Sequence, residues 1–352
     1  MNKRYLILED GTIFQGWGFG ADCSAVGELV FNTNVVGYVE TLTDPRNYGQ
    51  IVLQTFPLIG NYGIMEEDFE GEPKLGGYVV KEYCERPSNF RCEYDLDTFM
   101  KKYHIPGLCG VDTRELTNRL REFGVVNAML TDKLPDNMDE ISAYVITGAV
   151  EATGTKEEKE YPAQGEEKAH VALLDYGASV SLVRSLTARG CRVTVLPALT
   201  VAEKVLALNP DGIVLSAGPG DPAENKEAIA IVKELAGKKP MFAVGLGHQI
   251  LALAMGGETY KLKAGHRGGN QPCHKEGSRR TYITSQNHGY AVDASTVPGA
   301  VLSFVNINDH TCAGLNYPEL HAFSVQFDPE SCTGPANRNE LFDQFLSMMK
   351  ED

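Results

Sequence analysis

The sequence lacks a long apolar stretch, an excess of basic residues and closely spaced cysteine pairs. Lys and Arg number 32 against 47 Asp and Glu, which gives a net charge of −15 at pH 7. Sequence-independent binding of nucleic acid requires a basic surface, so this balance argues against nucleic acid as a partner. No apolar run approaches the roughly 20 residues of a membrane-spanning helix, and only four apolar residues separate Arg4 from Glu9, so we predict no signal peptide. We therefore expect a cytoplasmic protein that binds neither nucleic acid nor membrane.

The eight cysteines are scattered, and none is spaced like a zinc knuckle or a redox motif. Buried thiols in a reducing compartment are the simplest interpretation. Cys273 and His274, with His266 nearby, could be proposed as metal ligands, but no second pair of ligands accompanies them at tight spacing. We predict no metal site.

The organisation changes once along the 352 residues, a length that suits about two domains. Residues 1–150 open with short β-rich runs separated by Gly and Asp-Pro turn signals and continue into helical spacing at 95–122. We interpret Gly16-Trp-Gly-Phe-Gly20 as turn chemistry, because no helical pattern follows it. Residues 151–169 are polar and lack periodicity, so we interpret them as a linker to a second domain, residues 170–352.

The second domain alternates strand and helix patterns. Apolar runs at 170–175, 192–197, 212–216 and 241–244 are separated by helical patterns at 179–188, 201–208 and 225–236. Continuous apolar strands between helices of this length predict a mostly parallel sheet covered on both faces. Ligands of such sheets bind at the carboxyl ends of the strands. We therefore expect the loops after Ser216, Val244 and Phe327 to converge on one site.

The run Met241-Phe-Ala-Val-Gly-Leu-Gly-His-Gln249 predicts a strand, a sharp turn and a helix. Hydrolytic α/β enzymes use such a turn to expose a nucleophile. Its apex here is Gly245, which has no side chain with which to attack a substrate.

Three motifs occur in the order found in class I glutamine amidotransferases: Gly218-Pro-Gly-Asp-Pro222, Gly245-Leu-Gly-His-Gln249 and Phe327-Asp-Pro-Glu330. More narrowly, the chain resembles the small-chain family of carbamoyl-phosphate synthase. Further segments that carry this resemblance are Leu8–Thr12, Phe56–Gly63, Asp112–Thr117, Tyr260–Asn270 and Ser285–Tyr290. Nearly the whole chain is covered, including an N-terminal domain that other glutamine amidotransferases lack. The resemblance implies a β-rich α/β domain followed by an amidotransferase-like domain.

In that family a cysteine, a histidine and a glutamate hydrolyse glutamine. The resemblance places the nucleophile at Gly245, the base at Asp328 and the orienting carboxylate at Glu330, so only Glu330 keeps its family identity. A carboxylate at 328 cannot replace the imidazole that pairs with a thiolate. We therefore predict that glutamine hydrolysis is lost.

The resemblance also implies positions that contact glutamine: Arg46, Gly218, Gly220, Leu246, Gln249, Asn287, Gly289 and Tyr290. Position 46 resembles a serine site, and Ser179 and Ser181 stand where the family usually has Lys and Asn. We hypothesise that Arg46 pairs with Asp328 or Glu330, because opposite charges would offset each other's burial. His248 and His288 are expected to pack or to form hydrogen bonds.

By resemblance, the partner is a large synthetase chain that binds ATP and Mg and makes carbamoyl phosphate for pyrimidine or arginine synthesis; this chain itself needs no cofactor. Three hypotheses remain open. The first is a pseudo-glutaminase that supports an ammonia-dependent or structural role in a heterodimer. The second is an active glutaminase with a relocated thiol, Cys332 or Cys273. The third is a free-standing binding protein in which Arg46 clamps a carboxylate.

Overall fold

The computed structural model describes residues 2–331 and 340–351. The chain divides into two compact units, each described here by itself. Unit 1 comprises Met1–Thr147 and Lys263–Gly268, and unit 2 comprises Gly148–Leu262 and Gly269–Asp352. The second segment of unit 1 is the middle of one long strand, β15 (Glu258–Lys275), whose two ends belong to unit 2.

Unit 1 is built on a closed barrel of seven strands in the order β1-β2-β8-β6-β4-β3-β9. Pairings β3–β4, β4–β6 and β6–β8 are parallel, and the others are antiparallel. The barrel strands are β1 (Lys3–Leu8), β2 (Ile13–Gly20), β3 (Ala25–Asn32), β4 (Gln50–Gln54), β6 (Gly77–Val79), β8 (Pro106–Cys109) and β9 (Val126–Thr131). A separate parallel pair is formed by β5 (Leu58–Ile59) and β7 (Glu82–Tyr83).

Four helices accompany the barrel: α1 (Tyr38–Thr43), α2 (Leu96–Lys102), α3 (Thr113–Phe123) and α4 (Asp139–Ser142). Asp95 and Asp112 cap α2 and α3 by accepting hydrogen bonds from backbone N–H groups of the first turn. Leu116 and Leu120 of α3 are buried against barrel residues such as Leu53. The interpretation of Gly16–Gly20 as a turn is wrong. These residues form the second half of β2, where pairing with β1 and β8 overrides the local turn propensity of glycine.

Unit 2 contains a sheet of ten strands in the order β10-β12-β11-β13-β14-β19-β18-β17-β15-β16. Its parallel part is β12-β11-β13-β14-β19, as the alternation of strand and helix patterns predicted. These strands are β11 (Ala169–Asp175), β12 (Cys191–Pro197), β13 (Gly212–Leu215), β14 (Met241–Val244) and β19 (Ala322–Val325). The remaining strands are β10 (Lys159–Tyr161), β15, β16 (Thr281–Asp293), β17 (Val301–Asn306) and β18 (Cys312–Tyr317).

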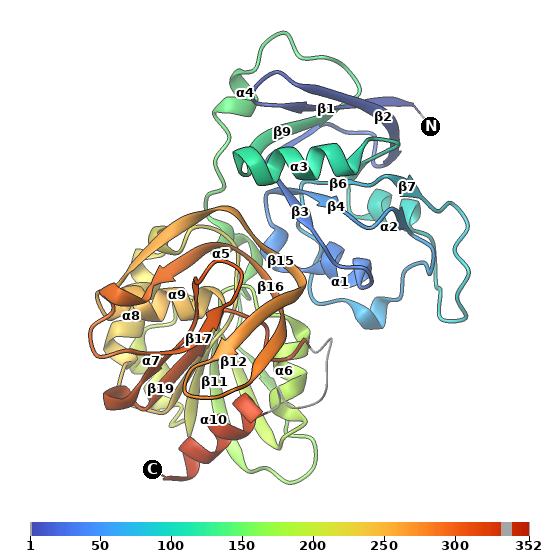
Figure 1. Cartoon of the computed structure of the whole chain (residues 1–352). Helices are drawn as coiled ribbons and strands as arrows, with labels where there is room; N and C mark the ends of the chain where they lie inside the picture. Colours follow the sequence, from blue (N-terminus) through green and yellow to red (C-terminus); the bar gives the residue numbers. More distant parts are fainter. Residues whose placement is uncertain (1, 332–339, 352) are drawn as a thin grey trace. The chain divides into compact units, whose positions relative to one another are not determined.

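Helices cover both faces of the parallel part, so its strands are buried throughout (Figure 1). Leu174 and Leu215 face a cluster that includes Val205, Val232 and Ile250, from α7 (Ala202–Ala207), α8 (Lys226–Leu235) and α9 (Leu246–Ala254). Side chains that point to the opposite face of the sheet, such as Val214, pack against α6 (Val180–Thr187) and α10 (Glu340–Glu351). This two-sided burial explains why the strands read as continuous apolar runs.

The stretch interpreted as a linker carries regular structure. α5 (Ala149–Thr153) lies at its start, and β10 pairs antiparallel with β12 at the edge of the sheet. All three residues of β10 are exposed, so no apolar alternation marks the strand in the sequence.

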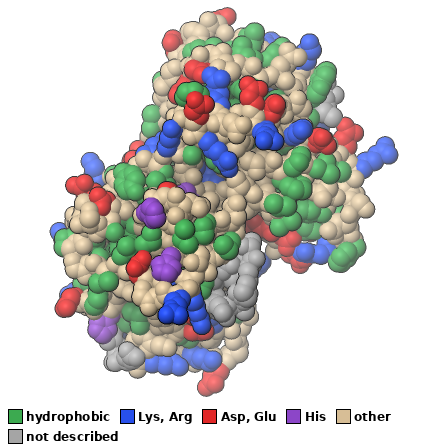
Figure 2. Space-filling view, in the orientation of Figure 1, with side chains coloured by type: hydrophobic (Ala, Val, Ile, Leu, Met, Phe, Trp, Pro, Cys, Tyr) green, Lys and Arg blue, Asp and Glu red, His purple; other side chains and the backbone are tan. Residues whose placement is uncertain are grey.

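Acidic and basic side chains are interspersed on the face seen in Figure 2. Within residues 2–331 and 340–351, no helix has the length and apolar character needed to cross a bilayer.

Candidate functional site

Gly245 occupies a sharp turn between β14 and α9. Its backbone has φ 56° and ψ −112°, a conformation that residues with a side chain rarely adopt. The turn is fixed by two hydrogen bonds of 2.9 Å, in which Gly245 N–H donates to the Val325 carbonyl and Gly247 N–H donates to the Ser216 carbonyl. The backbone therefore has the strand–turn–helix form that presents a nucleophile in α/β hydrolytic enzymes, without the nucleophile.

The space beside this turn is occupied by Ala217. A Cβ atom built on Gly245 would lie 2.9 Å from Ala217 Cβ and 3.3 Å from Ala217 Cα. Neither atom is the end of a flexible side chain, so a residue larger than glycine requires the backbone after β13 to move. Strain from the positive φ would add to this crowding.

Gly218 follows Ala217, and an added Cβ atom would have even less room there. A Cβ at Gly218 would lie 2.3 Å from the Tyr176 carbonyl oxygen and 2.9 Å from Leu246 Cδ2. The loop after β13 thus packs between the end of β11 and the first residue of α9. Leu246 itself is 3% exposed and belongs to the core, so its side chain is packed against protein atoms.

Gln249 is buried on α9, and its amide group is committed to protein contacts. Its Nε2 donates to the Tyr290 carbonyl at 2.7 Å and to Gln326 Oε1 at 2.9 Å. Because one amide has only two N–H groups, these contacts use both. Of the predicted glutamine-contacting residues, the structure thus brings Gln249 and Tyr290 together.

The other predicted residues of β16, Asn287 and Gly289, flank His288 and are partly exposed. His288 Nδ1 lies 2.7 Å from the Tyr290 carbonyl oxygen, and its Nε2 lies 2.8 Å from Gln286 Oε1. His288 therefore takes part in hydrogen bonds, as expected.

His248 lies in the first turn of α9 and is fully buried. Its Nδ1 is 2.7 Å from Ser324 Oγ on β19, whereas its Nε2 has no hydrogen-bond partner among the described residues. Burial lowers the pKa of His248 from 6.5 to about 3, because a charged imidazolium would lose its hydration. The imidazole nearest to the turn in sequence is thus a neutral core group.

Asp328 and Glu330 follow β19, the strand that pairs with β14. The two strands are parallel and Val244 pairs with Val325, so Gly245 and the loop that carries both carboxylates leave the same edge of the sheet. Asp328 is 2% exposed, and its N–H donates to the Ser285 carbonyl at 2.9 Å. A buried carboxylate thus stands where the resemblance places a histidine.

Glu330 is held at the start of α6. Ser179 Oγ donates to Glu330 Oε1 at 2.7 Å and accepts a hydrogen bond from Leu182 N–H at 3.2 Å. Ser179 is therefore both the cap of α6 and the partner of the retained glutamate. The sequence marks Ser179 as a departure from the family but does not reveal its partnership with Glu330. The available signal is the position of Ser179, a capping residue before an apolar helical pattern.

Arg46 belongs to unit 1, where it lies in a short 3₁₀ turn (Pro45–Asn47). Its Nε and Nη2 each donate to Asp44 at 2.8 Å, to Oδ1 and Oδ2 respectively, and both side chains are largely buried. This is a bidentate arginine–carboxylate pair within one unit. The hypothesised pair with Asp328 or Glu330 joins the two units and stays a prediction.

The seven cysteines that the structure describes form no disulfide. Cys273 is fully buried, and burial raises the pKa of its thiol to about 11. A thiol that stays protonated at neutral pH is a poor nucleophile. Cys332 lies outside the described residues. Within residues 2–331 and 340–351, no group of three or more His, Cys, Asp or Glu side chains could hold a metal ion.

Comparison with known proteins defines first the class and then the family. Residues 172–348 match the family model "Glutamine amidotransferase class-I", which assigns unit 2 to that class. Residues 6–130 match the model "Carbamoyl-phosphate synthase small chain, CPSase domain".

Three curated relatives match this sequence along nearly its whole length, and each is named "Carbamoyl phosphate synthase small chain". The protein of Fusobacterium nucleatum is 47% identical over 354 residues, covering 98% of both chains. That of Clostridium perfringens is 46% identical over 349 residues, covering 98% of this chain and 99% of the relative. That of Staphylococcus epidermidis is 45% identical over 359 residues, covering 100% of this chain and 97% of the relative. The chain belongs to the carbamoyl-phosphate synthase small-chain family.

Proposed function

We propose that this chain is a small chain that has lost glutamine hydrolysis and that acts with a large synthetase chain. In this role it supports carbamoyl phosphate synthesis from ammonia, or it shapes the conformation of its partner. The family and the names of its relatives support the pairing with a large chain. The large chain would bind ATP and Mg, and this chain would need no cofactor.

One observation gives the main support for the loss of glutamine hydrolysis. Gly245 lies at the apex of an intact turn, and Ala217 occupies the space that a Cβ atom would need. Attack on the amide carbon of glutamine requires a nucleophile at the apex and a base beside it. Asp328 at the base position supports the same conclusion, because a buried carboxylate does not form the thiolate–imidazolium pair on which this chemistry depends.

Two further observations support an altered glutamine pocket. Both amide N–H groups of Gln249 are used within the protein, so they do not meet a substrate carbonyl. Glu330 is paired with Ser179, so the carboxylate that would orient a histidine has a structural partner.

The alternatives have weaker support. A relocated thiol at Cys273 would be protonated and enclosed. A carboxylate clamp at Arg46 would compete with Asp44, which already accepts hydrogen bonds from Nε and Nη2 of the guanidinium.

The test is to purify the chain with its large chain and to supply glutamine or ammonium separately. We expect carbamoyl phosphate from ammonium, and no glutamate released from glutamine above the rate without protein. Glutamate release at the rate of an intact small chain would contradict the proposal. A glutamine-like electrophile that labels the chain, and fails to label Cys332→Ser, would support the relocated thiol.

A further inference from the structure

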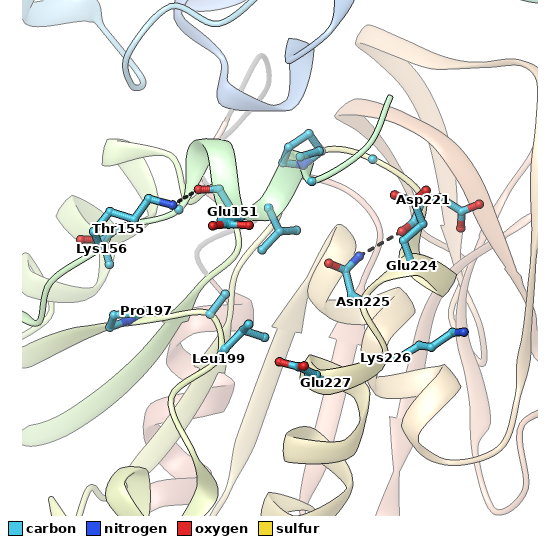
Figure 3. A pocket seen from close by; sticks show the side chains of 17 residues that line it. Glu151, Thr155, Lys156, Pro197, Leu199, Asp221, Glu224, Asn225, Lys226 and Glu227 are labelled. Carbon is cyan, nitrogen blue, oxygen red and sulfur yellow. Dashed lines mark hydrogen bonds between the residues drawn. The ribbon is translucent and has the colours of Figure 1, made fainter. Parts of the chain in front are cut away.

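A cavity of about 590 Å³ lies in unit 2 at the carboxyl ends of the parallel strands (Figure 3). Its walls come from the end of β12 (Pro197–Leu199), the loop after β13 (Pro219–Asp221), α5 and the start of α8. In the sheet, β12 and β13 lie on opposite sides of β11, so the direction in which strands are added reverses after β12. Crevices at such a reversal are the usual ligand sites of parallel sheets, and this volume suits a small organic molecule.

The loop that forms one wall also packs against the turn described above. Gly218 contacts the end of β11 and Leu246 of α9, while Pro219, Gly220 and Asp221 line the cavity. The cavity is therefore separate from the Gly245 turn but shares a loop with it. Of the residues that the resemblance assigns to glutamine, only Gly220 lines this space.

One part of the lining is apolar. Ala149, Val150 and Ala198 are buried and line the cavity. Leu199, which is 51% exposed, also lines the cavity, as do Pro197 and Pro219. An exposed leucine at the margin of a concave space offers apolar area that an aliphatic ligand can cover.

The other part of the lining is negatively charged. Four carboxylates, from Glu151, Asp221, Glu224 and Glu227, accompany two lysines, Lys156 and Lys226. Asp221 accepts a hydrogen bond from the N–H of Ala223, and the amino group of Lys156 contacts the carbonyl of Glu151.

The directions of these side chains leave the acidic groups available to a ligand in the cavity. Among the described residues, no ion pair involves Glu151, Glu224 or Glu227. In Figure 3 the side chain of Glu227 extends toward Leu199, and that of Lys226 extends the opposite way. The carboxylate of Glu227 is thus turned to the apolar side of the cavity, where no lysine compensates it.

We propose that this cavity binds an organic cation, an aliphatic chain that carries ammonium groups. Glu151 and Glu227 hold the ammonium groups through charge-assisted hydrogen bonds, and Val150, Leu199 and Pro219 cover the aliphatic chain. A bare metal ion does not fit, because no set of three ligating side chains meets there within the described residues.

Calorimetric titration of the full-length chain with cadaverine tests the proposal. Pentanediol, which has the same chain length without charge, and glutarate, which has the opposite charge, are the control ligands. We expect saturable binding of cadaverine at one site and none of either control. The double variant Glu151→Gln/Glu227→Gln should weaken cadaverine binding at least about tenfold, the scale of losing one charged contact. Both residues are exposed, so the variants should fold.

Two further variants separate this cavity from general attraction to an acidic protein. Glu234→Gln removes a charge from the same helix two turns away, and should leave binding unchanged. Leu199→Trp fills the margin of the cavity without changing charge, and should abolish binding. Equal losses for Glu227→Gln and Glu234→Gln, full binding by Leu199→Trp, or no saturable binding of cadaverine would each overturn the proposal.

Discussion

The turn after β14 and the loop after β19 lie at the same edge of the sheet, and they bear on the proposed loss of glutamine hydrolysis in opposite ways. At Gly245 the backbone keeps the strained form of a nucleophile turn, but the side chain is absent. After β19 two charged side chains are present, but Glu330 is paired with the cap of α6 and Asp328 is buried at the base position. The first region has the backbone geometry of a nucleophile turn, and the second has two carboxylate residues whose described contacts are structural.

This contrast shows that scaffold and chemistry are separable. The turn survives because it is fixed by hydrogen bonds to β19 and to the end of β13, which do not require a side chain at position 245. Such a turn is part of the packing between α9 and the sheet, so folding alone preserves it.

The largest expected effect concerns restoration of activity. We predict that Gly245→Cys alone leaves glutamate release at least roughly a thousandfold below that of an intact small chain, because members of a catalytic unit act together. Glutamate release in the complex with the large chain is the measurement.

The combined variant Ala217→Gly/Gly245→Cys/Asp328→His is the comparison for this prediction. It gives the new Cβ room and supplies an imidazole, so it should release more glutamate than the single variant. Recovery by Gly245→Cys alone would show that neither Ala217 nor Asp328 prevents glutamine hydrolysis.

The second effect is a pH dependence at His248. Its pKa is about 3 in the folded protein and about 6.5 when unfolded, so between these values the unfolded state binds more protons. The contribution to stability is complete above pH 6.5 and falls by about 1.4 kcal/mol per pH unit on acidification toward pH 3. Urea unfolding at several pH values should show this slope in the native chain.

The variant His248→Asn should lose that part of the slope, since asparagine can still bond Ser324 but does not titrate. The matched variant His274→Asn, on β15, should keep it. An unchanged slope in His248→Asn would mean that the imidazole near the turn is not a neutral core group.

The third effect is the cost of a side chain at the turn. We predict that Gly245→Ala lowers the free energy of unfolding by about 2–4 kcal/mol, through backbone strain and contact with Ala217. Gly256→Ala is the matched control: it also has positive φ, +89°, but no heavy atom lies within 4 Å of its added Cβ. It should cost only the strain, about 1–2 kcal/mol. Equal losses would show that Ala217 does not crowd the turn.

The smallest expected effect concerns the loop after β19, where Glu330 is bound by Ser179. Ser179→Ala removes the cap of α6 and the hydrogen bond to Glu330, so it should cost about 1–2 kcal/mol in urea unfolding. Ser185→Ala, within the same helix, should be close to neutral. A neutral Ser179→Ala would indicate that Glu330 does not depend on this partner.

The parallel part of unit 2 was predictable because each signal is local. Apolar runs and helical periodicity placed β11–β14 and α6–α8 to within a few residues. The edge strand β10 escaped prediction because its pairing with β12 leaves Lys159–Tyr161 exposed, so no burial pattern forms. The insertion of residues 263–268 into unit 1 likewise has no local mark, since they continue the strand β15.

The site was predictable only in part, because the sequence order of motifs does not fix contacts between side chains. The sharp turn at Gly245 follows from a strand, a glycine and a helical pattern. The commitment of Gln249 to Tyr290 and Gln326, and of Glu330 to Ser179, depends on elements far apart in the chain. The crowding by Ala217 depends on the close packing of the loops after β13 and β14.

Nitrogen transfer from glutamine labelled with ¹⁵N in its amide group tests the central claim most directly. The purified complex of this chain with its large chain would receive labelled glutamine and unlabelled ammonium together. We predict carbamoyl phosphate without ¹⁵N and no labelled ammonia in solution. Carbamoyl phosphate that carries the label, formed at the rate of an intact small chain, would contradict it.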